Sequence, residues 1–434
     1  MRCGFPGKYE LFSALMYAGP HRSPSKVEPM VQEFDKVGVV GLGTMGAGIA
    51  EVFARAGFNV VGVEIDQDAC DRGRGHVDRS LSRAVGRGKI SEEERAAIDA
   101  RLTFTTSRED LSDADFVVEA VPEHMNIKQD VFGDLDRICP PGTILATNTS
   151  SLSVTEIAAL TGRPDKVVGL HFFNPAPVMK LAEVITTVST SRETVELVTE
   201  VAKRIGKTPV TVGDRAGFVA NALLVPYIND AIRLYERKIA GREEIDAAAQ
   251  KAADLPMGPL ALADMVGLDV CLAVMDVLWE EYRDARYVAS PLLRRMVAAG
   301  HHGRKTGKGF YAGQDERPEP TPDGRLAQMI REEENLDLGE MLLAPQIDDA
   351  LRMIGDGYVD AKDIDTAMQF GCGYPKGPTE LLEDRGPESV ISTLVTMGEY
   401  SLTTIAVPAP LLMDRLPEVE AGEGHGQGGC ACQA

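Results

Sequence analysis

The sequence predicts an α/β fold in which an N-terminal doubly wound domain precedes two small all-α domains in tandem. Three observations lead to this prediction. Short β-rich runs alternate with helical segments over the first half of the chain, which is typical of a parallel sheet covered by helices. From Gly217 onward the apolar residues follow helical spacing only, and within this helical half a stretch of sequence recurs.

The elements of the first half follow from the positions of these runs. The segment 47–56 is typical of a helix, and Gly57 stands where a glycine that ends a helix belongs. Ser91 and Glu94 form the capping-box pattern at the start of a later helix. We expect strands at residues 37–40, 59–65, 116–121, 143–147, 167–173 and 209–212.

A glycine-rich motif joins the first expected strand to the first helix. Gly41, Gly43 and Gly46 form G-x-G-x-x-G, with Thr44 and Met45 inside the motif. Such glycines let a pyrophosphate approach the N-terminus of a helix, as in Rossmann-type domains. The alternative is a purely structural glycine turn, which the position between a strand and a helix disfavours.

Glu64 ends the second strand, 18 residues after Gly46. Its carboxylate can accept the ribose hydroxyls of a dinucleotide and would repel a 2′-phosphate, so the predicted cofactor is NAD rather than NADP. Asp66 is a second acid that could take this role.

The helical half repeats itself. The segments 223–234 and 342–353 align without a gap at an offset of 119 residues, and the offset holds as far as Gly377. A constant offset over this span indicates two copies of one small helical domain. The second copy departs from the first at two positions, where Glu340 replaces Asn221 and Leu336 replaces Gly217.

These patterns divide the chain into six predicted segments. Residues before the first strand contain several prolines and no sustained periodicity, so they are either disordered or, ahead of Met30, an over-extended start. The predicted segments are a disordered extension at 1–34, a Rossmann-type NAD-binding domain at 35–213, a helical domain at 214–312, a linker at 313–338, the second helical copy at 339–416 and a disordered tail at 417–434.

Charge and composition limit the partners. The 434 residues include 66 acidic and 45 basic ones, a formal net charge of -21. A surface this acidic argues against nucleic acid, whose phosphates require clustered Lys and Arg. No run approaches the roughly 18 apolar residues of a membrane helix, so we expect no membrane partner.

The seven cysteines are too few for a disulfide scaffold, which favours a reduced, cytoplasmic chain. Cys430 and Cys432 lie near His425 in a Gly-rich tail. A soft-metal site is one interpretation of them, and two incidental thiols in a disordered tail are the other. We favour the second and predict no metal site.

A second set of polar residues follows the later strands. Asn148 and Ser150 lie after one strand, His171 at the end of the next, and Glu183 beyond it. Open α/β sheets bind their ligands at this edge. A histidine there can take the proton of an alcohol as hydride leaves the carbon, and a carboxylate on its other nitrogen would fix the tautomer. A lone histidine is more often a core residue, but its H-F-F-N-P context favours the functional interpretation.

With these motifs in place, the sequence resembles the L-3-hydroxyacyl-CoA dehydrogenase family, which includes 3-hydroxybutyryl-CoA dehydrogenases. The resemblance covers about residues 36–312 and is carried by G-L-G-T-M-G-A-G-I-A, V-V-E-A-V-P-E, N-T-S-S-L, G-L-H-F-F-N-P-A-P-V-M-K-L-A-E-V-I and K-T-G-K-G-F-Y. It implies NAD-dependent oxidation of L-3-hydroxyacyl-CoA to 3-oxoacyl-CoA, or the reverse reduction.

The resemblance also implies roles for particular residues. His171 is the base and Glu183 its partner, while Ser150 and Asn221 hold the reacting oxygen of the substrate and the base. The active site then lies between the sheet and the helices. On the nicotinamide side of the cofactor pocket, the matching positions are Glu123, Lys128, Asn148 and Asn174.

Coenzyme A carries phosphates, and a short basic run stands out in this acidic chain. Either these basic side chains bind the phosphates of coenzyme A, or they form an ordinary solvent-exposed face of a helix. Its residues are Arg79, Arg83, Arg87 and Lys89.

Two other functions stay open. β-Hydroxyacid dehydrogenases, acting on a free or carrier-bound acid, also begin G-L-G-x-M-G, but they generally use a lysine and lack H-F-F-N-P. A non-catalytic NAD(H)-binding sensor is the second alternative, and the presence of all four implied catalytic residues argues against it.

In the family the helical domain commonly mediates dimerisation, and some members carry two copies. We therefore predict that the two copies pack together as an intramolecular pseudo-dimer, and a homodimer of such chains stays open.

Overall fold

The computed structural model describes residues 34–311, 313, 327–330, 336–405 and 407–416. The predicted disordered segments, the C-x-C tail and most of the predicted linker lie outside the described residues. Phe34, the last residue of the predicted extension, and Ile330, within the predicted linker, instead belong to the core. Phe34 is 4% exposed and its ring packs against Phe116, and Ile330 is fully buried.

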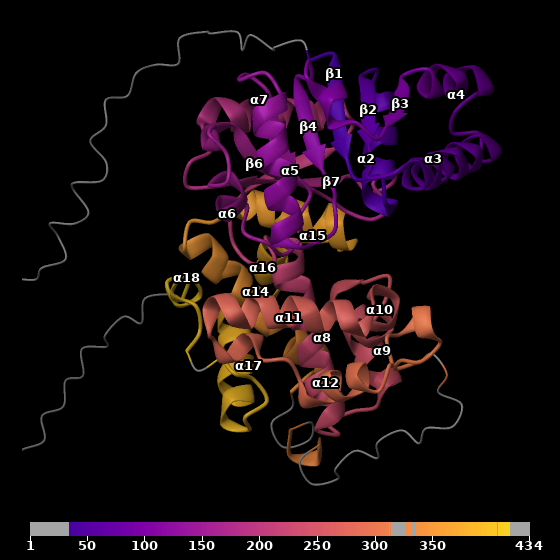
Figure 1. Cartoon of the computed structure of the whole chain (residues 1–434). Coiled ribbons are helices and arrows are strands. Elements are labelled where there is room, and N and C mark those ends of the chain that lie inside the picture. Colours follow the sequence, from indigo (N-terminus) through magenta and orange to yellow (C-terminus); the bar gives the residue numbers. More distant parts are fainter. Residues whose placement is uncertain (1–33, 312, 314–326, 331–335, 406, 417–434) are drawn as a thin grey trace, which may run out of the picture. The chain divides into compact units, whose positions relative to one another are not determined.

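The first half of the chain forms an eight-stranded sheet with the order β3-β2-β1-β4-β5-β6-β7-β8 (Figure 1). Strands β1 to β6 are parallel, β7 is antiparallel to β6, and β8 is parallel to β7. The strand order reverses between β1 and β4, which is where such sheets bind ligands. The strands are β1 (Lys36–Val40), β2 (Asn59–Val63), β3 (Leu102–Thr105), β4 (Phe116–Glu119), β5 (Ile144–Thr147), β6 (Val167–Phe172), β7 (Leu181–Thr186) and β8 (Thr208–Gly213).

Side chains alternate between the two faces along each strand, and in the buried strands they are apolar on both faces. Helices therefore cover both faces of the sheet. In β4, for example, Phe116 and Val118 join one hydrophobic cluster, with α2, α3, α4 and α7, whereas Val117 joins another, with α5 and α6. The helices are α2 (Thr44–Arg55), α3 (Gln67–Gly86), α4 (Glu92–Asp99), α5 (Met125–Ile138), α6 (Val154–Ala158) and α7 (Arg192–Arg204).

The predicted fold class is confirmed, and all six expected strands are present with ends that differ by at most two residues. The capping box of Ser91 and Glu94 begins α4 as expected. Two of the eight strands, β7 and β3, are not among the six expected ranges. The second of them, β3, lies at one edge of the sheet. This edge strand has four residues, and only Leu102 is buried, so it produces no apolar run.

The second half of the chain contains two similar series of helices. Helices α15, α16, α17 and α18 each begin 119 residues after α9, α10, α11 and α12. The first series is α8 (Ala220–Glu236), α9 (Arg242–Ala253), α10 (Pro259–Val266), α11 (Leu268–Tyr282) and α12 (Pro291–Ala298); the second is α14 (Leu338–Gly355), α15 (Ala361–Cys372), α16 (Pro378–Arg385), α17 (Pro387–Glu399) and α18 (Pro410–Met413).

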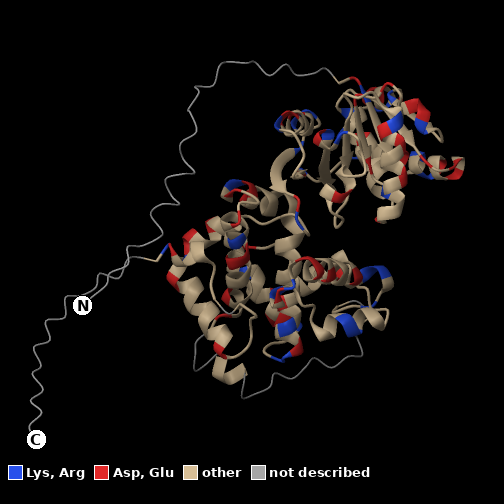
Figure 2. Ribbon diagram, turned by 60° about the vertical axis from the view of Figure 1, so that its left-hand side comes forward, with Lys and Arg blue, Asp and Glu red and all other residues tan. Residues whose placement is uncertain are grey.

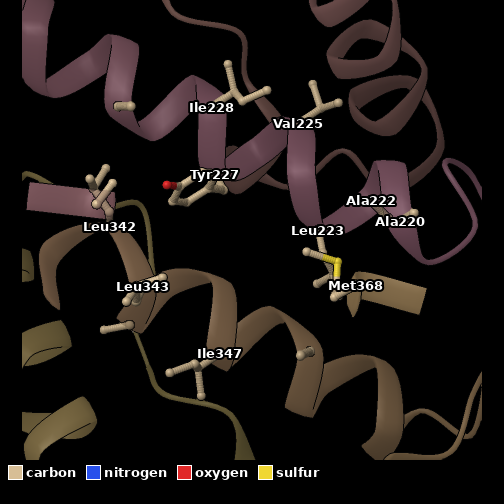
Figure 3. Packing of buried hydrophobic residues seen from close by; sticks show 14 of the residues in the cluster. Ala220, Ala222, Leu223, Val225, Tyr227, Ile228, Leu342, Leu343, Ile347 and Met368 are labelled. Carbon is tan, nitrogen blue, oxygen red and sulfur yellow. The ribbon is translucent and has the colours of Figure 1, made fainter. Parts of the chain in front are cut away.

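Both series contribute to one hydrophobic cluster, and α8 and α14 lie at its centre. In Figure 3, Leu223 on α8 points toward Met368 on α15, and Tyr227 on α8 points toward Leu342 on α14. The Nε2 of Gln346 donates to the carbonyl of Leu223 at 3.3 Å. Nearly every residue of α14 is buried, as expected for a helix with apolar residues all round.

Helix α15 also packs against strands β7 and β8 (Figure 1). The backbone N–H of Thr211 in β8 donates to the carboxylate of Asp363 at 2.8 Å, and the N–H of Gly213 donates to the carbonyl of Tyr358 at 2.9 Å. The second series of helices is therefore attached directly to the sheet.

Acidic and basic residues are interspersed over the helices in Figure 2. Within the described part of the chain, no helix combines the length and the apolar character that crossing a membrane requires.

Candidate active site

The glycine-rich loop between β1 and α2 is tightly closed on one side and open on the other. Gly41 has a φ of 89°, which favours glycine, and a side chain at Gly46 would overlap the carbonyl oxygen of Gly41. A Cβ on Gly43, in contrast, would meet nothing within 4 Å. The open side faces the N-terminus of α2, whose free N–H groups and dipole favour an anion.

Glu64, just beyond the end of β2, holds this loop. Its Oε1 accepts a hydrogen bond from the N–H of Leu42 at 2.6 Å, and its Oε2 accepts one from the N–H of Ile65 at 3.0 Å. Asp66, the other acid considered, instead caps α3 by accepting from the N–H of Ala69 at 2.7 Å. The geometry thus favours Glu64 as the acid beside the loop.

A cavity of about 860 Å³ opens over the glycine loop. It is lined by five of the residues predicted to bind the cofactor and by Arg108 and Arg137, which pair with Asp134 and Glu109, respectively. The open side of Gly43 and the carboxylate of Glu64 suit the pyrophosphate and a ribose of a dinucleotide. The five residues are Gly41, Gly43, Thr44, Met45 and Glu64.

A buried charge network lies next to the loop, at the end of β4. The ammonium group of Lys128, 1% exposed, binds both carboxylate oxygens of Glu119 at 2.8 Å and lies 3.4 Å from Oε2 of Glu123. The hydroxyl of Thr147 donates to Glu119 at 2.6 Å. Burial with complete pairing of this kind holds side chains in one arrangement.

Glu123 organises the turn that follows β5. Its Oε1 accepts hydrogen bonds from the hydroxyl of Thr149 at 2.6 Å and from the N–H groups of Ser150 and Ser151 at 2.8 and 3.0 Å. Burial alone would raise the pKa of Glu123, but the charge of Lys128 and these donors outweigh it and hold the pKa below its ordinary value.

The central feature of the site is the pair of His171 and Glu183, called the acid–base pair below. The two residues stand opposite each other on the antiparallel strands β6 and β7, and Nδ1 of His171 lies 2.7 Å from Oε2 of Glu183. Both side chains are buried, and the imidazole ring packs on Phe173 and Phe218 at 4.7 and 5.5 Å between ring centroids. A carboxylate oxygen accepts, so the proton sits on Nδ1 and Nε2 is the basic nitrogen.

Glu183 also binds the start of the helical half. Its Oε1 accepts from the N–H groups of Val219 and Ala220, each at 3.0 Å, at the N-terminus of α8. Gly217 and Phe218 have positive φ values of 69° and 48°, which turn the chain into this position. One carboxylate therefore orients the histidine and caps α8 at once.

The structure brings some of the other predicted residues to this edge. Asn221 is half-buried in the first turn of α8, directly after the donors to Glu183. Asn148 accepts from the N–H of Phe172 at 2.8 Å and so ties β5 to the end of β6. Ser150 is half-buried beside Glu123, and Asn174 is exposed after β6. The basic run on and after α3 is exposed and contacts none of these residues.

Three parts of the site were missed by sequence reasoning. Glu119 was detectable, because a glutamate inside an apolar strand needs a buried partner. Thr149 lies within the N-T-S-S segment, but nothing in the sequence links it to Glu123. The approach of α15 to the acid–base pair, described below, leaves no local sequence signal.

The doubly wound sheet, the glycine loop with its acid and the histidine–carboxylate pair at one edge are features of an NAD-dependent dehydrogenase. The pattern of the 3-hydroxyacyl-CoA dehydrogenase NAD binding domain matches residues 36–215, and that of the C-terminal domain of the same family matches twice, at 217–313 and 339–431. The chain belongs to the 3-hydroxyacyl-CoA dehydrogenase family.

Individual relatives agree with this family. A 3-hydroxybutyryl-CoA dehydrogenase of Clostridioides difficile is 50% identical over 276 residues, 64% of this chain and 98% of that protein. The human mitochondrial hydroxyacyl-coenzyme A dehydrogenase is 43% identical over 63% of this chain and 90% of its own length. The crystal structure of an Escherichia coli 3-hydroxybutyryl-CoA dehydrogenase has a TM-score of 0.80 and 31% identity, and the match covers 88% of this chain and 98% of that one.

Proposed function

We propose that this protein interconverts L-3-hydroxyacyl-CoA and 3-oxoacyl-CoA with NAD, with 3-hydroxybutyryl-CoA among its substrates. The observation that carries the proposal is the acid–base pair at the ligand-binding edge of the sheet, in a chain related to 3-hydroxybutyryl-CoA dehydrogenases. When bound, NAD supplies the acceptor for the hydride that leaves C3 of the substrate.

His171 removes the proton of the 3-hydroxyl group through Nε2. Glu183 holds Nδ1 protonated and stabilises the positive charge that the ring gains, and this charge lies in a buried site where pairing is strong. In the reductive direction the same ring returns the proton to the oxygen of the ketone.

Ser150 and Asn221 donate hydrogen bonds to the reacting oxygen and to the base. The half-buried positions of both residues support this role, as does the anchoring of their segments by Glu123 and Glu183. Lys128 keeps Glu123 ionised, and Glu123 then fixes the turn on the nicotinamide side together with Asn148 and Asn174.

The phosphates of coenzyme A bind the basic run on and after α3. All four of its side chains are exposed, and none forms an ion pair with an acid within the described residues; Arg79 lies within hydrogen-bonding distance of His76. Charge reversal at Arg83 and Arg87 should raise KM for acetoacetyl-CoA and leave KM for acetoacetyl-pantetheine, which lacks the nucleotide, unchanged. An equal rise with both thioesters would contradict this assignment.

The two helical copies form a pseudo-dimer within one chain, which their shared core supports. We also propose a cytoplasmic location, supported by the free thiols of Cys70, Cys139, Cys271 and Cys372.

The first experiment is acetoacetyl-CoA-dependent oxidation of NADH, compared with NADPH, for wild type and His171→Ala. We expect NADH consumption by wild type, a strong preference over NADPH, and loss of activity in the variant with NADH binding intact. A wild type that binds NADH but turns over no acyl thioester would overturn the proposal.

A further inference from the structure

The last turn of α15 lies beside the acid–base pair, although α15 belongs to the second helical copy. A Cβ built on Gly371 would lie 3.7 Å from Cε1 of Phe173, 3.7 Å from Cβ of Ala220 and 2.5 Å from Cδ2 of Leu181. Each neighbour adjoins the pair: the ring of Phe173 packs on the imidazole, Ala220 donates to the carboxylate, and Leu181 precedes the carboxylate on β7.

The residues on either side of Gly371 extend this contact. Burial, together with the nearby charge of Glu183, raises the pKa of the Cys372 thiol, which is consistent with a short distance between the two side chains. On the outer side, the aromatic ring of Phe370 is 38% exposed, and Nζ of Lys180, in the loop between β6 and β7, lies 5.9 Å from its centroid.

Comparison of the two copies shows which residues at this contact are required for the packing of the helices. Across the two copies, Gly371 corresponds to Ala252, and Ala252 packs on Gly339, the counterpart of Ala220, so small residues at this contact serve the packing of the copies. Phe370 corresponds to Lys251, which is exposed. Helix packing therefore does not require an aromatic side chain at this position.

Phe370 provides an exposed aromatic surface next to the contact between α15 and the acid–base pair. Phe218 and Phe173 flank the imidazole, Phe173 adjoins Gly371, and Phe370 follows at the exposed end. Such a surface suits an acyl chain, because burying apolar area against it is favourable, whereas the phosphates of coenzyme A prefer cations.

We propose that the second helical copy forms one wall of the active site and that Phe370 determines which acyl chains are accepted. This inference rests on the proposed function and adds a specificity residue to it. The second copy, which lacks the counterpart of Asn221, would thus contribute to substrate selection without contributing to the chemistry.

The test exchanges the residues of the two copies in the full-length protein. Phe370→Lys places the residue of the first copy beside the active site, and Lys251→Phe is the matched control at the corresponding position of the first copy. We measure kcat/KM for acetoacetyl-CoA and for 3-oxodecanoyl-CoA, and KM for NADH. We expect Phe370→Lys to lower the ratio of long-chain to short-chain kcat/KM by about tenfold, the order of effect that one changed pocket contact produces.

Three further variants distinguish an effect on acyl-chain selection from a loss of folding. Phe370→Leu should recover most of the ratio, and Lys251→Phe should leave both the ratio and the KM for NADH unchanged. If Phe370→Lys does not fold, as judged by circular dichroism, Phe370→Ser carries the same expectation. A wild-type ratio in a folded polar variant overturns this inference alone, whereas a wild type inactive on every acyl-CoA overturns the proposed function and this inference with it.

Discussion

Glu183 is the residue on which most of the site depends, because its two oxygens bind different parts of the molecule. Oε2 accepts a hydrogen bond from Nδ1 of His171, and Oε1 accepts hydrogen bonds from two backbone N–H groups at the start of α8. The sequence indicated this pairing only conditionally, since two residues 12 apart meet only if their strands are neighbours. The antiparallel register of β6 and β7 meets that condition.

Replacing Glu183 by Gln tests the chemistry of the pair. The amide oxygen can still accept one set of donors, but the amide cannot stabilise a positive imidazole, so we expect kcat to fall by about 10²- to 10⁴-fold. The affinity for NADH, measured by fluorescence titration, should stay at the wild-type value. A variant with the wild-type kcat would rule out the proposed partnership.

Glu123 gives a prediction of pH dependence. Its pKa lies below the ordinary 4.5 in the folded protein, so its ionisation stabilises the fold above pH 4.5, and this contribution is lost as the pH falls through the lowered pKa. Glu123→Gln should therefore unfold at lower urea concentration than wild type at pH 7, and the difference should shrink below pH 4.5. A difference that is the same at pH 7 and pH 4 would contradict the role assigned to this carboxylate.

At the scale of elements, the loop between β1 and α2 separates folding from binding. The two glycines Gly43 and Gly46 are three residues apart in one motif, yet a methyl group at the first meets open space and at the second meets backbone. The motif alone predicted that both matter, and the structure distinguishes the reasons.

We therefore expect opposite results from two similar substitutions. Gly43→Ala should keep the wild-type Tm and lose NADH affinity, because the methyl group would occupy the space next to the helix N-terminus. Gly46→Ala should lower the Tm, because the loop must shift to accommodate it. Thermal unfolding with and without NADH measures both effects. If NADH raises the Tm of Gly43→Ala as much as that of wild type, the open side of the loop has no binding role.

Elements with strong local patterns were predictable from the sequence, and those fixed by distant contacts were not. A strand such as β4 is recognisable in the sequence because it is a run of mostly apolar, buried residues. The edge strand β3 has only one buried residue, and its conformation depends on pairing with β2. Similarly, Asp363 at the start of α15 has no local signal that it binds the edge of β8. Such contacts depend on tertiary structure, which periodicity does not encode.

For the whole molecule, the repeat predicted two similar series of helices, and the structure adds that they share one core. The face of α8 that carries Leu223 and Tyr227 is covered by the second series (Figure 3). The offset of the repeat could not indicate that this second series would also touch the sheet.

A chain that ends after Gly313 should expose this apolar face and lose the cover on β7 and β8. We expect it to associate or precipitate, since contiguous exposed apolar surface of this extent drives association. Light scattering after size-exclusion chromatography, with the full-length protein as control, measures the effect. A shortened chain that stays monomeric, soluble and fully active would refute the pseudo-dimer.

Hybrid enzymes assembled from two relatives would meet an unusual obstacle in this architecture. The natural point of exchange between the sheet and the helices is near Gly213, where β8 ends. An exchange there takes the carboxylate of Glu183 from one parent and its donors at Val219 and Ala220 from the other. The border between the sheet and the helices is thus a poor site for recombination, because the position of Glu183, and with it that of the proposed base His171, depends on both sides of it.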